Sequence, residues 1–459
     1  MKKKKILLIC LLFFNTFNII ARDVLTLDSA LTLASKNNSE IKKARYEISR
    51  AKAVKNEVRG NYFPQVEING GGYHALNPIL EYGINDLPNA NIRDLLNTLY
   101  AEYGATVGLP NSIEVFQQTA VASAVAVQPV FMGGKITSGN KLANIGIKAA
   151  ELQSEVTQRD VLLSVEENYW LIVGLEEKRQ TINSIHMLLD TLHFQVQRAI
   201  TAGVAMSNDL LSVELRQNEI EEQRLKLDNG IVLARLALSY NIGISADSIK
   251  ELECIAITDS VLPLIKRSST SHRPEHQLLK YKIQSEELQK RMTLADALPQ
   301  IAIGATYSYL GFSSTKYKTE GNRLPTGNSW NSRDNGLFFV SLKIPLSSWG
   351  MTSYKLKEHE ALITEAEIDQ LDLTQKMTLQ ENQAYNAMEE AYSQIIRQQS
   401  GLKSAQENLR IMRINYEAGL TSITELLQAQ TLLLQAENNL TDAKISYRIN
   451  KRKYEALTK

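Results

Sequence analysis

Cysteine is nearly absent from this chain. Of 459 residues, only Cys10 and Cys254 are cysteines. Cys10 lies in an N-terminal segment that has the features of a removable leader, so the mature chain would keep a single thiol. An intrachain disulfide is therefore excluded, and so is any function that needs a pair of cysteines.

The chain also has no excess of positive or negative charge. The chain has 51 Lys and Arg against 50 Asp and Glu, a formal net charge of +1 and a pI near 7.7. Such a balance indicates no basic surface, and we expect no nucleic acid partner. The mean hydropathy of −0.21 excludes a membrane protein built from many apolar helices.

Residues for catalysis or metal binding are few and poorly placed. The sequence contains no phosphate-binding loop and no nucleophile elbow. His272 and His276 are four residues apart, but no third ligand is near and Pro274 lies between them, which favours a helix start over a metal site. His186 and His193 share a helix face and are expected to face solvent or a neighbouring helix. We predict no enzyme activity, no metal site and no cofactor.

One apolar run stands at the N-terminus. Four lysines follow the first methionine, an apolar stretch covers residues 6–20, and Ala21 is a suitable residue before a cleavage site. A membrane anchor is the alternative, but the stretch is about 15 residues long and contains two asparagines, whereas a membrane-spanning helix needs about 20 residues. Residues 1–21 are therefore predicted to be a signal peptide, and the mature protein to leave the cytoplasm.

Helix-breaking residues are scarce over two long stretches. Gly134 and Gly203 lie about 69 residues apart, and so do Gly350 and Gly419. At 1.5 Å per residue, each stretch predicts a single helix roughly 100 Å long. A typical helix has about 11 residues, so two such helices of equal length are not an accident of composition. The two expected long helices cover residues 136–201 and 352–418.

The chain repeats itself. An offset of about 216 residues places Pro129 on Pro345 and aligns the glycines that bound the two long helices. Upstream the offset is about 235, because the first half carries an insertion of about 19 residues after Pro64. Because the two halves align in this way, we predict one structural unit used twice. The predicted parts are a first repeat at 22–241, a linker at 242–270 and a second repeat at 271–459.

Shorter helices and four strands account for the remaining elements. Helix-capping residues and 3.6-residue periodicity predict the helices, and stretches that alternate every second residue predict the strands. The shorter helices are about half as long as the long ones, so two of them stacked end to end match one long helix. Helices are expected at 28–59, 207–240, from 274 onward and at 422–457. A polar insert at 75–118 is expected to contain a short helix near 92–103. Strands are expected at 65–74, 119–131, 301–312 and 336–345, with a polar loop at 313–335.

The strands have the length and the faces of membrane-spanning strands. Each is expected to have about 10 residues, enough to cross a bilayer when tilted. In the fourth, Phe338, Val340 and Leu342 share one face, and Ser341 and Lys343 share the other. The alternative is a soluble β-sandwich whose sheet has one face exposed to solvent, which would give the same alternation. Four strands leave two open edges, which lipid does not tolerate, and closed barrels begin at about 8 strands, so the chain must form an oligomer.

These elements, in this order and doubled, resemble the TolC-like outer membrane efflux protein family over nearly the whole mature chain. The specific pieces are the RPE sequence at 273–275, the Pro-x4-Gly segments at 129–134 and 345–350, and the turn sequences TAGVAMSNDLL and YEAGLTSITELL. The resemblance implies a mainly α fold with a β-barrel. Three chains would form a 12-stranded barrel in the outer membrane of a Gram-negative bacterium, continued by a long α-helical barrel across the periplasm.

The resemblance also implies a function. The protein would be an outer-membrane channel, a passive exit duct of a tripartite efflux or type I secretion system. Its partners would be a periplasmic adaptor protein, an inner-membrane pump and outer-membrane lipid. The alternative is a periplasmic coiled-coil adaptor or scaffold without a pore, because the second long helix carries coiled-coil spacing. An adaptor predicts one hairpin flanked by compact β domains, whereas this sequence has two hairpins and amphipathic strands.

The resemblance assigns the gate to the two helix turns. Gly203 and Val204, together with Gly419 and Leu420, would form turns that close the periplasmic entrance and dock the adaptor. At the opposite ends of the long helices, Phe131 and Trp349 would lie near the inner edge of the bilayer as aromatic anchors.

Five residues near the turns correspond by position to the family's gate. Asp209 and Tyr416 match a pair that latches the closed state, and Glu425 matches an aspartate whose three copies form a cation-favouring ring. Thr421 stands where a basic residue is often found, and Gln428 replaces a second entrance aspartate. The chemistry of the residues leaves another interpretation open. Asp209 and Glu425 lie in first helical turns, where the helix dipole favours an acidic cap.

Overall fold

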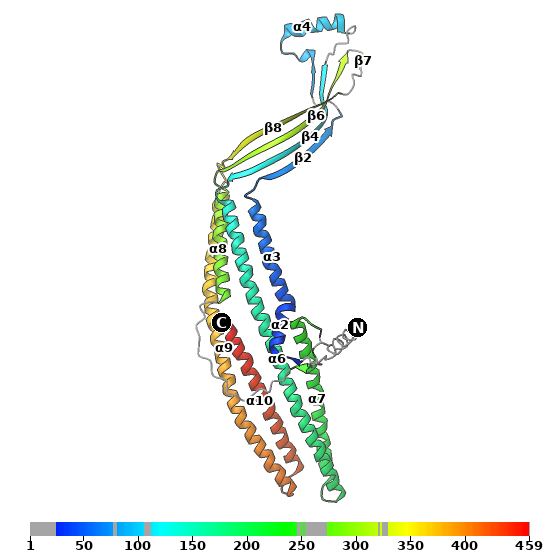
Figure 1. Cartoon of the computed structure of the whole chain (residues 1–459), viewed down its shortest axis with the longest axis vertical. Helices are drawn as coiled ribbons and strands as arrows, with labels where there is room; N and C mark the ends of the chain where they lie inside the picture. Colours follow the sequence, from blue (N-terminus) through cyan, green and yellow to red (C-terminus); the bar gives the residue numbers. More distant parts are fainter. Residues whose placement is uncertain are drawn as a thin grey trace, which may run out of the picture. The chain divides into compact units, whose positions relative to one another are not determined.

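The computed structural model resolves into two compact units (Figure 1). The helical unit comprises Met1–Ala51, Ile147–Lys282 and Glu365–Lys459, and the sheet unit comprises Lys52–Gly146 and Ile283–Thr364. The structure describes residues 24–76, 80–104, 112–245, 249, 251–252, 273–319, 322–323 and 329–458. The predicted signal peptide, most of the predicted linker and His272 lie outside the described residues.

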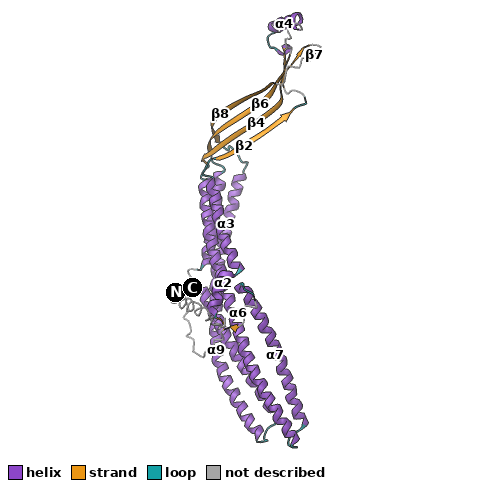
Figure 2. Cartoon of the chain, turned by 45° about the vertical axis from the view of Figure 1, so that its right-hand side comes forward, coloured by secondary structure: helices purple, strands orange, loops and turns teal. Residues whose placement is uncertain are grey.

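Four long antiparallel strands form most of a six-stranded sheet, and strands are drawn as orange arrows in Figure 2. Their order is β2-β4-β6-β8, and a two-residue strand, β7, pairs with the end of β6. The main strands are β2 (Gln65–His74), β4 (Ser112–Phe131), β6 (Gln300–Thr319) and β8 (Ser329–Lys343), and the short one is β7 (Asn322–Arg323).

Three of the four strands are longer than predicted. The expected length of about 10 residues holds for β2, but β4 and β6 have 20 residues each and β8 has 15. The polar loop expected at 313–335 is likewise wrong, since backbone pairing of β6 with β8 continues to Ser314 and Ser329. Backbone pairing does not need apolar side chains, so an apolar alternation marks only part of each strand.

The register gathers the apolar faces of neighbouring strands on one side of the sheet. Ile301 of β6 lies opposite Leu342 of β8, and Ile303 lies opposite Val340. Directly paired residues of antiparallel strands point to the same face. Phe338 continues this surface and is 92% exposed in the single chain. One face of the sheet is therefore apolar and uncovered.

The insert between β2 and β4 contains the predicted helix. Strand β3 (Leu80–Gly83) pairs with the start of β4 and is followed by η1 (Ile84–Asp86). Helix α4 (Ala90–Leu99) comes next and ends in a π-helical turn, η2 (Tyr100–Gly104). The side chain of Asn89 caps α4 by accepting a hydrogen bond from the amide of Ile92 at 3.3 Å. Between β6 and β8, the described residues contain no helix.

The two long helices match the prediction to within one residue at each end. Helices α6 (Lys135–Thr201) and α9 (Met351–Glu417) have 67 residues each. The helices that follow them, α7 (Ser207–Ile242) and α10 (Ile423–Thr458), have 36 residues each. The second half of the chain adds α8 (Pro274–Ala295), which begins at the predicted proline.

The predicted helix at 28–59 is wrong as a single element. The structure has two helices there, α2 (Leu27–Asn37) and α3 (Ser39–Gly60), and Thr26 caps the first. Asn38 separates them, because its side-chain oxygen accepts hydrogen bonds from the next helix start, at 2.8 Å from the amide of Glu40. Its side-chain nitrogen donates to the carbonyl of Asn241 at the end of α7, at 2.7 Å. The break therefore lies where α7 ends.

A short strand pair lies beside this junction. β1 (Val24–Leu25) runs parallel to β5 (Glu251–Leu252), which falls inside the predicted linker. The hydroxyl of Tyr169 on α6 donates to the carbonyl of Leu25 at 3.3 Å and fixes β1 to the long helix. A local sequence pattern could not reveal this pair, because its two strands are more than 200 residues apart.

Helices α6 and α10 approach closely in the core of the helical unit. A Cβ added to Gly174 of α6 would lie 1.9 Å from Cδ1 of Ile445 on α10. Beside this contact, the guanidinium of Arg448 lies 4.2 Å from the ring centroid of Trp170. Arg452 binds the carboxylate of Glu166 at 2.8 Å. The second half of α10 is thus held on α6 by packing and by charge.

Candidate functional site

The turn between α6 and α7 depends on a glycine. Gly203 has φ +74°, a conformation that residues with a side chain rarely adopt. The amide of Val204 donates to the carbonyl of Ala199 at 2.9 Å, five residues earlier, which ends α6 with a left-handed cap. The chain then reverses within a few residues and enters α7 at Ser207.

The turn between α9 and α10 has the same construction. Gly419 has φ +71°, and the amide of Leu420 donates to the carbonyl of Asn415 at 2.8 Å. Figures 1 and 2 place both turns at the same end of the helical unit. The residues that follow the glycines are open to solvent, with Val204 80% and Leu420 78% exposed. The structure therefore presents two apolar tips at one end of the helical unit.

Apolar packing supports the tips from inside. A cluster of buried side chains joins the ends of the two hairpins. Its buried members come from α6, α7 and α10, and partly buried residues of α9 pack against them, so the hairpins share one core below the turns. Representative buried residues are Leu189, Val196, Val213, Ile220, Leu426 and Leu434.

The structure brings the two residues of the predicted latch into electrostatic reach of each other. Tyr416 packs against the cluster below the tips, and burial raises the pKa of its hydroxyl, as does the nearby charge of Asp209. Both residues are described, and no hydrogen bond joins them in the single chain. The carboxylate of Asp209 instead accepts a hydrogen bond from the amide of Met206 at 3.1 Å, which caps α7.

Glu425 also caps the start of its own helix. Its Oε2 atom accepts hydrogen bonds from the amide of Ser422 at 2.9 Å, from the hydroxyl of Ser422 at 3.1 Å and from the hydroxyl of Thr421. In return, the amide of Glu425 donates to the hydroxyl of Ser422 at 3.3 Å. The Thr421 hydroxyl, followed by the Ser422 amide and hydroxyl, holds the pKa of Glu425 below its ordinary value of 4.5. The carboxylate therefore stays charged.

The remaining predicted gate position lies on the surface. Gln428 is exposed one turn after Glu425, while Gln430 is buried. Gln430 was missed by the sequence analysis. The sequence gives no sign that Gln430 is buried, because most glutamines are exposed.

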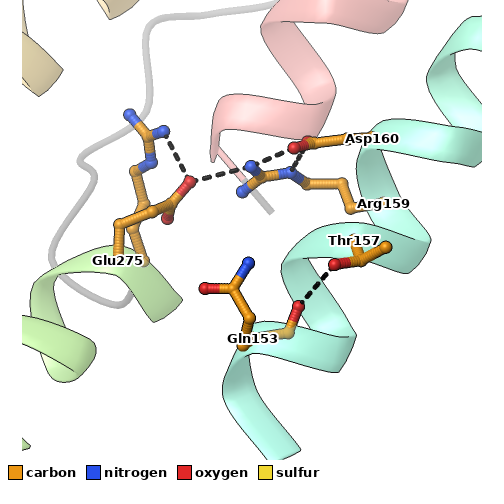
Figure 3. A network of polar contacts seen from close by, with 6 residues as sticks. Gln153, Thr157, Arg159, Asp160 and Glu275 are labelled. Atoms are coloured by element: carbon orange, nitrogen blue, oxygen red, sulfur yellow. Dashed lines mark hydrogen bonds and ion pairs between the residues drawn. The ribbon is translucent and has the colours of Figure 1, made fainter. Parts of the chain in front are cut away.

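A second polar cluster lies where α8 begins (Figure 3). Arg159 of α6 donates to the carboxylates of Asp160 and Glu275, at 2.9 and 2.8 Å, and Arg273 donates to Glu275 at 3.0 Å. Burial raises the pKa of Glu275, but the hydrogen bonds from Arg159, the backbone and Arg273 outweigh it and hold the pKa at about 2. The RPE sequence thus ties the start of the second repeat to α6.

This cluster borders a cavity in the helical unit. The volume of the cavity is about 600 Å³. The side chains around it come from α6, α8, α9 and α10, and several of them are polar. Its polar lining residues include Arg159, Arg273, Glu275, Gln380, Asn450 and Lys453.

The two predicted aromatic anchors lie in the sheet unit. Phe131 ends β4 and is about half exposed. Trp349, between β8 and α9, is 93% exposed and has φ +48°, which costs backbone strain in a residue with a side chain. A large indole held outward in this way suits the boundary between lipid and water, where tryptophan is enriched.

The described part of the chain holds no group of three or more His, Cys, Asp or Glu that could bind a metal ion. His186 lies 3.1 Å from the carboxylate of Asp190, and His193 lies 3.5 Å from that of Glu214, so both have acidic partners. No helix in the described residues is both long enough and apolar enough to cross a membrane.

Comparison with known proteins gives consistent matches. Residues 270–458 match the family described as outer membrane efflux protein. The outer membrane protein TolC of Escherichia coli K12 is 22% identical over 370 residues, which cover 77% of this chain and 72% of that protein. Over residues 270–458, the chain belongs to the outer membrane efflux protein family.

Solved structures show the same fold. The outer membrane protein VceC of Vibrio cholerae superposes with a TM-score of 0.71 at 14% identity, over 94% of this chain and 96% of that one. The CmeC outer membrane channel of Campylobacter jejuni gives a TM-score of 0.71 at 16% identity, over 94% and 85%. The fold is that of TolC-family channels, which combine a β-barrel with a long α-helical barrel. The matches together identify an outer-membrane efflux channel that reaches into the periplasm.

Proposed function

We propose that three copies of this TolC-family chain form one passive duct, closed at the helix tips and opened by a periplasmic adaptor and an inner-membrane pump. The open edges of the sheet carry the proposal. Among the described strands, β2 pairs only with β4, and β8 pairs with β6, so the outer edge of each is unpaired. In lipid, each unsatisfied backbone group costs several kcal/mol.

Joining copies edge to edge removes both open edges. If β2 of one copy pairs with β8 of the next, three copies supply twelve strands, more than the roughly 8 that a closed barrel needs. The apolar face of the sheet supports the same assembly, since a closed barrel turns that face toward lipid. The opposite face carries Glu67, Asn69, Ser123 and Lys343, which suits a water-filled interior.

The helix tips support the proposed gate and docking site. Val204 and Leu420 are apolar side chains held outward by rigid glycine turns, and exposed apolar groups of this kind are typical of protein contacts. Asp209 and Tyr416 lie on different hairpins and influence each other electrically, so a movement of the hairpins would separate them. We assign the energy for transport to the pump, because the sequence has no nucleotide-binding loop, and we infer no enzyme activity.

Single-channel conductance in a planar bilayer tests the duct and the gate together. The protein is compared with the variant Asp209→Ala/Tyr416→Phe. We expect a small, cation-selective conductance that rises in the variant, because the latch is lost. Conductance that is equal in both proteins supports the duct and rejects the gate assignment.

A crosslinking experiment tests the trimer separately. Cysteines are placed on β2 and β8, at Asn69 and Ser341, with Cys254 replaced by serine, and a flexible bis-maleimide is added. Because the two positions lie on the two outer strands, links between copies should give a ladder that ends at the trimer. A protein that stays soluble and monomeric without detergent, with no conductance, would instead favour the scaffold without a pore.

A further inference from the structure

Helix α4 carries an apolar stripe that nothing in the single chain covers. Ile92, Leu95 and Leu99 follow a three-four spacing, and Leu96 widens the stripe. All four side chains are exposed, and Leu95 is 59% exposed. An amphipathic helix normally buries its apolar stripe, so this one lacks a partner in the single chain.

A different side of α4 packs on its own insert. Arg93 and Asn97 of α4 and Tyr100 at the start of η2 are partly buried, and they lie together on one side. The Nδ2 atom of Asn97 donates to Oδ1 of Asn85 in η1 at 2.9 Å. The contacts that fix α4 therefore leave the stripe of Ile92, Leu95 and Leu99 turned away from the insert.

The charge of the insert does not suit a lipid surface. Residues 75–118 contain five carboxylates and a single arginine, Arg93. Helices that lie on membranes are rich in Lys and Arg on their polar face, because lipid headgroups are often anionic. The polar face of α4 instead carries Asn91, Asp94 and Thr98. The stripe is thus better matched by another protein surface.

We propose that the three α4 helices of one trimer pack against each other through Ile92, Leu95 and Leu99 and form a cap over the outer mouth of the duct. The proposal rests on the proposed trimer. The spacing of these residues is that of the a and d positions of a coiled coil. The same residue from three chains can meet only around the three-fold axis of a trimer. In a trimeric duct, that axis is the pore.

The position of the insert allows this contact. α4 lies between β2 and β4, at the end of these strands away from α3 and α6, and β2 is the edge strand that meets the next copy. The β3–β4 hairpin extends the insert beyond the end of β2. All three α4 helices are therefore carried at the same end of the barrel, beside the contact between copies.

Tethering explains how so short a helix can assemble. An isolated helix of 10 residues is not stable in water, and three of them would not associate. Here Asn89 caps α4, the insert holds it, and the trimer keeps its copies at a high effective concentration. The second repeat shows no helix between its strands in the described residues, so the cap would come from the insertion in the first repeat.

Disulfide formation tests the contact. In the background Cys254→Ser, Leu99→Cys places a thiol on the stripe, and the matched control Asp94→Cys places one on the opposite side of α4. Oxidation of membranes should link two of the three chains in Leu99→Cys, giving a dimer on a denaturing gel, and should leave Asp94→Cys monomeric. Equal linking of both variants, or of neither, overturns the proposal.

Conductance tests the cap. In the gate variant Asp209→Ala/Tyr416→Phe, whose tips no longer limit the current, the added substitutions Ile92→Ser/Leu95→Ser/Leu99→Ser should raise the single-channel conductance about twofold or more, because the obstruction on the axis is lost. The control Asn91→Ser/Thr98→Ser on the polar face should conduct as the parent does. An unchanged conductance in the triple variant means that α4 does not narrow the mouth, and it overturns the cap.

The tests separate this inference from the proposed function. If crosslinks at β2 and β8 give trimers but Leu99→Cys does not link, the trimer stands and the cap is rejected. If the strand crosslinks give no trimer, the proposed function fails first. A fluorophore on Leu99→Cys that is quenched by nitroxide-labelled lipid in proteoliposomes would show α4 lying on the membrane, which also rejects the cap.

Discussion

Glu275 shows how much one residue can contribute at a junction of elements. Its carboxylate accepts hydrogen bonds from Arg159 of α6 and from Arg273, and it stands in the first turn of α8, where a negative charge is favoured. The sequence analysis singled out RPE only as part of a family resemblance. Its physical role could not be predicted, because Arg159 is 116 residues away along the chain.

The stability contributed by Glu275 should depend on pH. Its pKa is depressed to about 2 in the folded protein from an ordinary value of 4.5. A carboxylate of this kind stabilises the fold fully above pH 4.5, and the stabilisation is lost as the pH falls toward 2. We expect Glu275→Gln to lower the thermal unfolding midpoint at pH 7 by several degrees and to lower it progressively less between pH 4.5 and 2. Calorimetry in detergent at a series of pH values measures this.

The control for this experiment is Glu155→Gln, on the exposed side of the same long helix as Arg159. It should change the midpoint little at any pH. A Glu275→Gln variant whose deficit is the same at pH 7 and pH 3 would show that the lost contact, rather than the charge, is what matters.

At the scale of elements, the start of α10 raises the question of what the Glu425 carboxylate does. It can cap the helix, or it can form part of a charged ring in the trimer. All three hydrogen bonds to Glu425 end on Oε2, so the residue caps its helix while it remains charged. The sequence left ring and cap open as alternatives for this residue. The structure shows the cap in the single chain, and the ring requires the trimer.

Two substitutions separate ring from cap. Glu425→Gln removes the charge but keeps an oxygen that can accept from the Ser422 amide, so we expect the preference for cations over anions to fall several-fold. Ser422→Ala keeps the charge and removes a cap, which costs about 1 kcal/mol, and should leave the preference unchanged. Reversal potentials in a salt gradient measure both variants. Equal selectivity in all three proteins would leave Glu425 with a capping role alone.

Long elements were easier to predict than their junctions. α6 and α9 were located to within one residue, because the absence of proline and the scarcity of glycine over more than 60 residues are a strong signal. The break at Asn38 was missed, since it depends on a hydrogen bond to Asn241 from another part of the chain. The ends of β4, β6 and β8 were missed because backbone pairing continues after the apolar alternation stops.

At the scale of the whole molecule, the sequence indicated an assembly that a single chain cannot display. The argument came from unpaired edges and an apolar face, and the structure has both. The gate residues came from resemblance to a family, and they stay predictions. The structure places Asp209, Tyr416 and Glu425 near the turns, but three-fold contacts decide what they do. The stripe on α4 was not predicted, because the short helix was noted without its faces.

Adjacent residues of β8 provide the most direct test of the barrel. Val340 lies on the apolar face and Ser341 on the opposite one. Arginine on the lipid side of a membrane strand costs about 2–4 kcal/mol at the middle of the bilayer, and three copies multiply the cost. Val340→Arg should therefore reduce the amount of trimer in the outer membrane sharply. Ser341→Arg should assemble and make the channel less selective for cations, since its charge would face the pore. Gel analysis of membrane fractions and conductance measure the two effects. If Ser341→Arg were the variant that failed to assemble, the lipid and water faces assigned to the sheet would have to be exchanged.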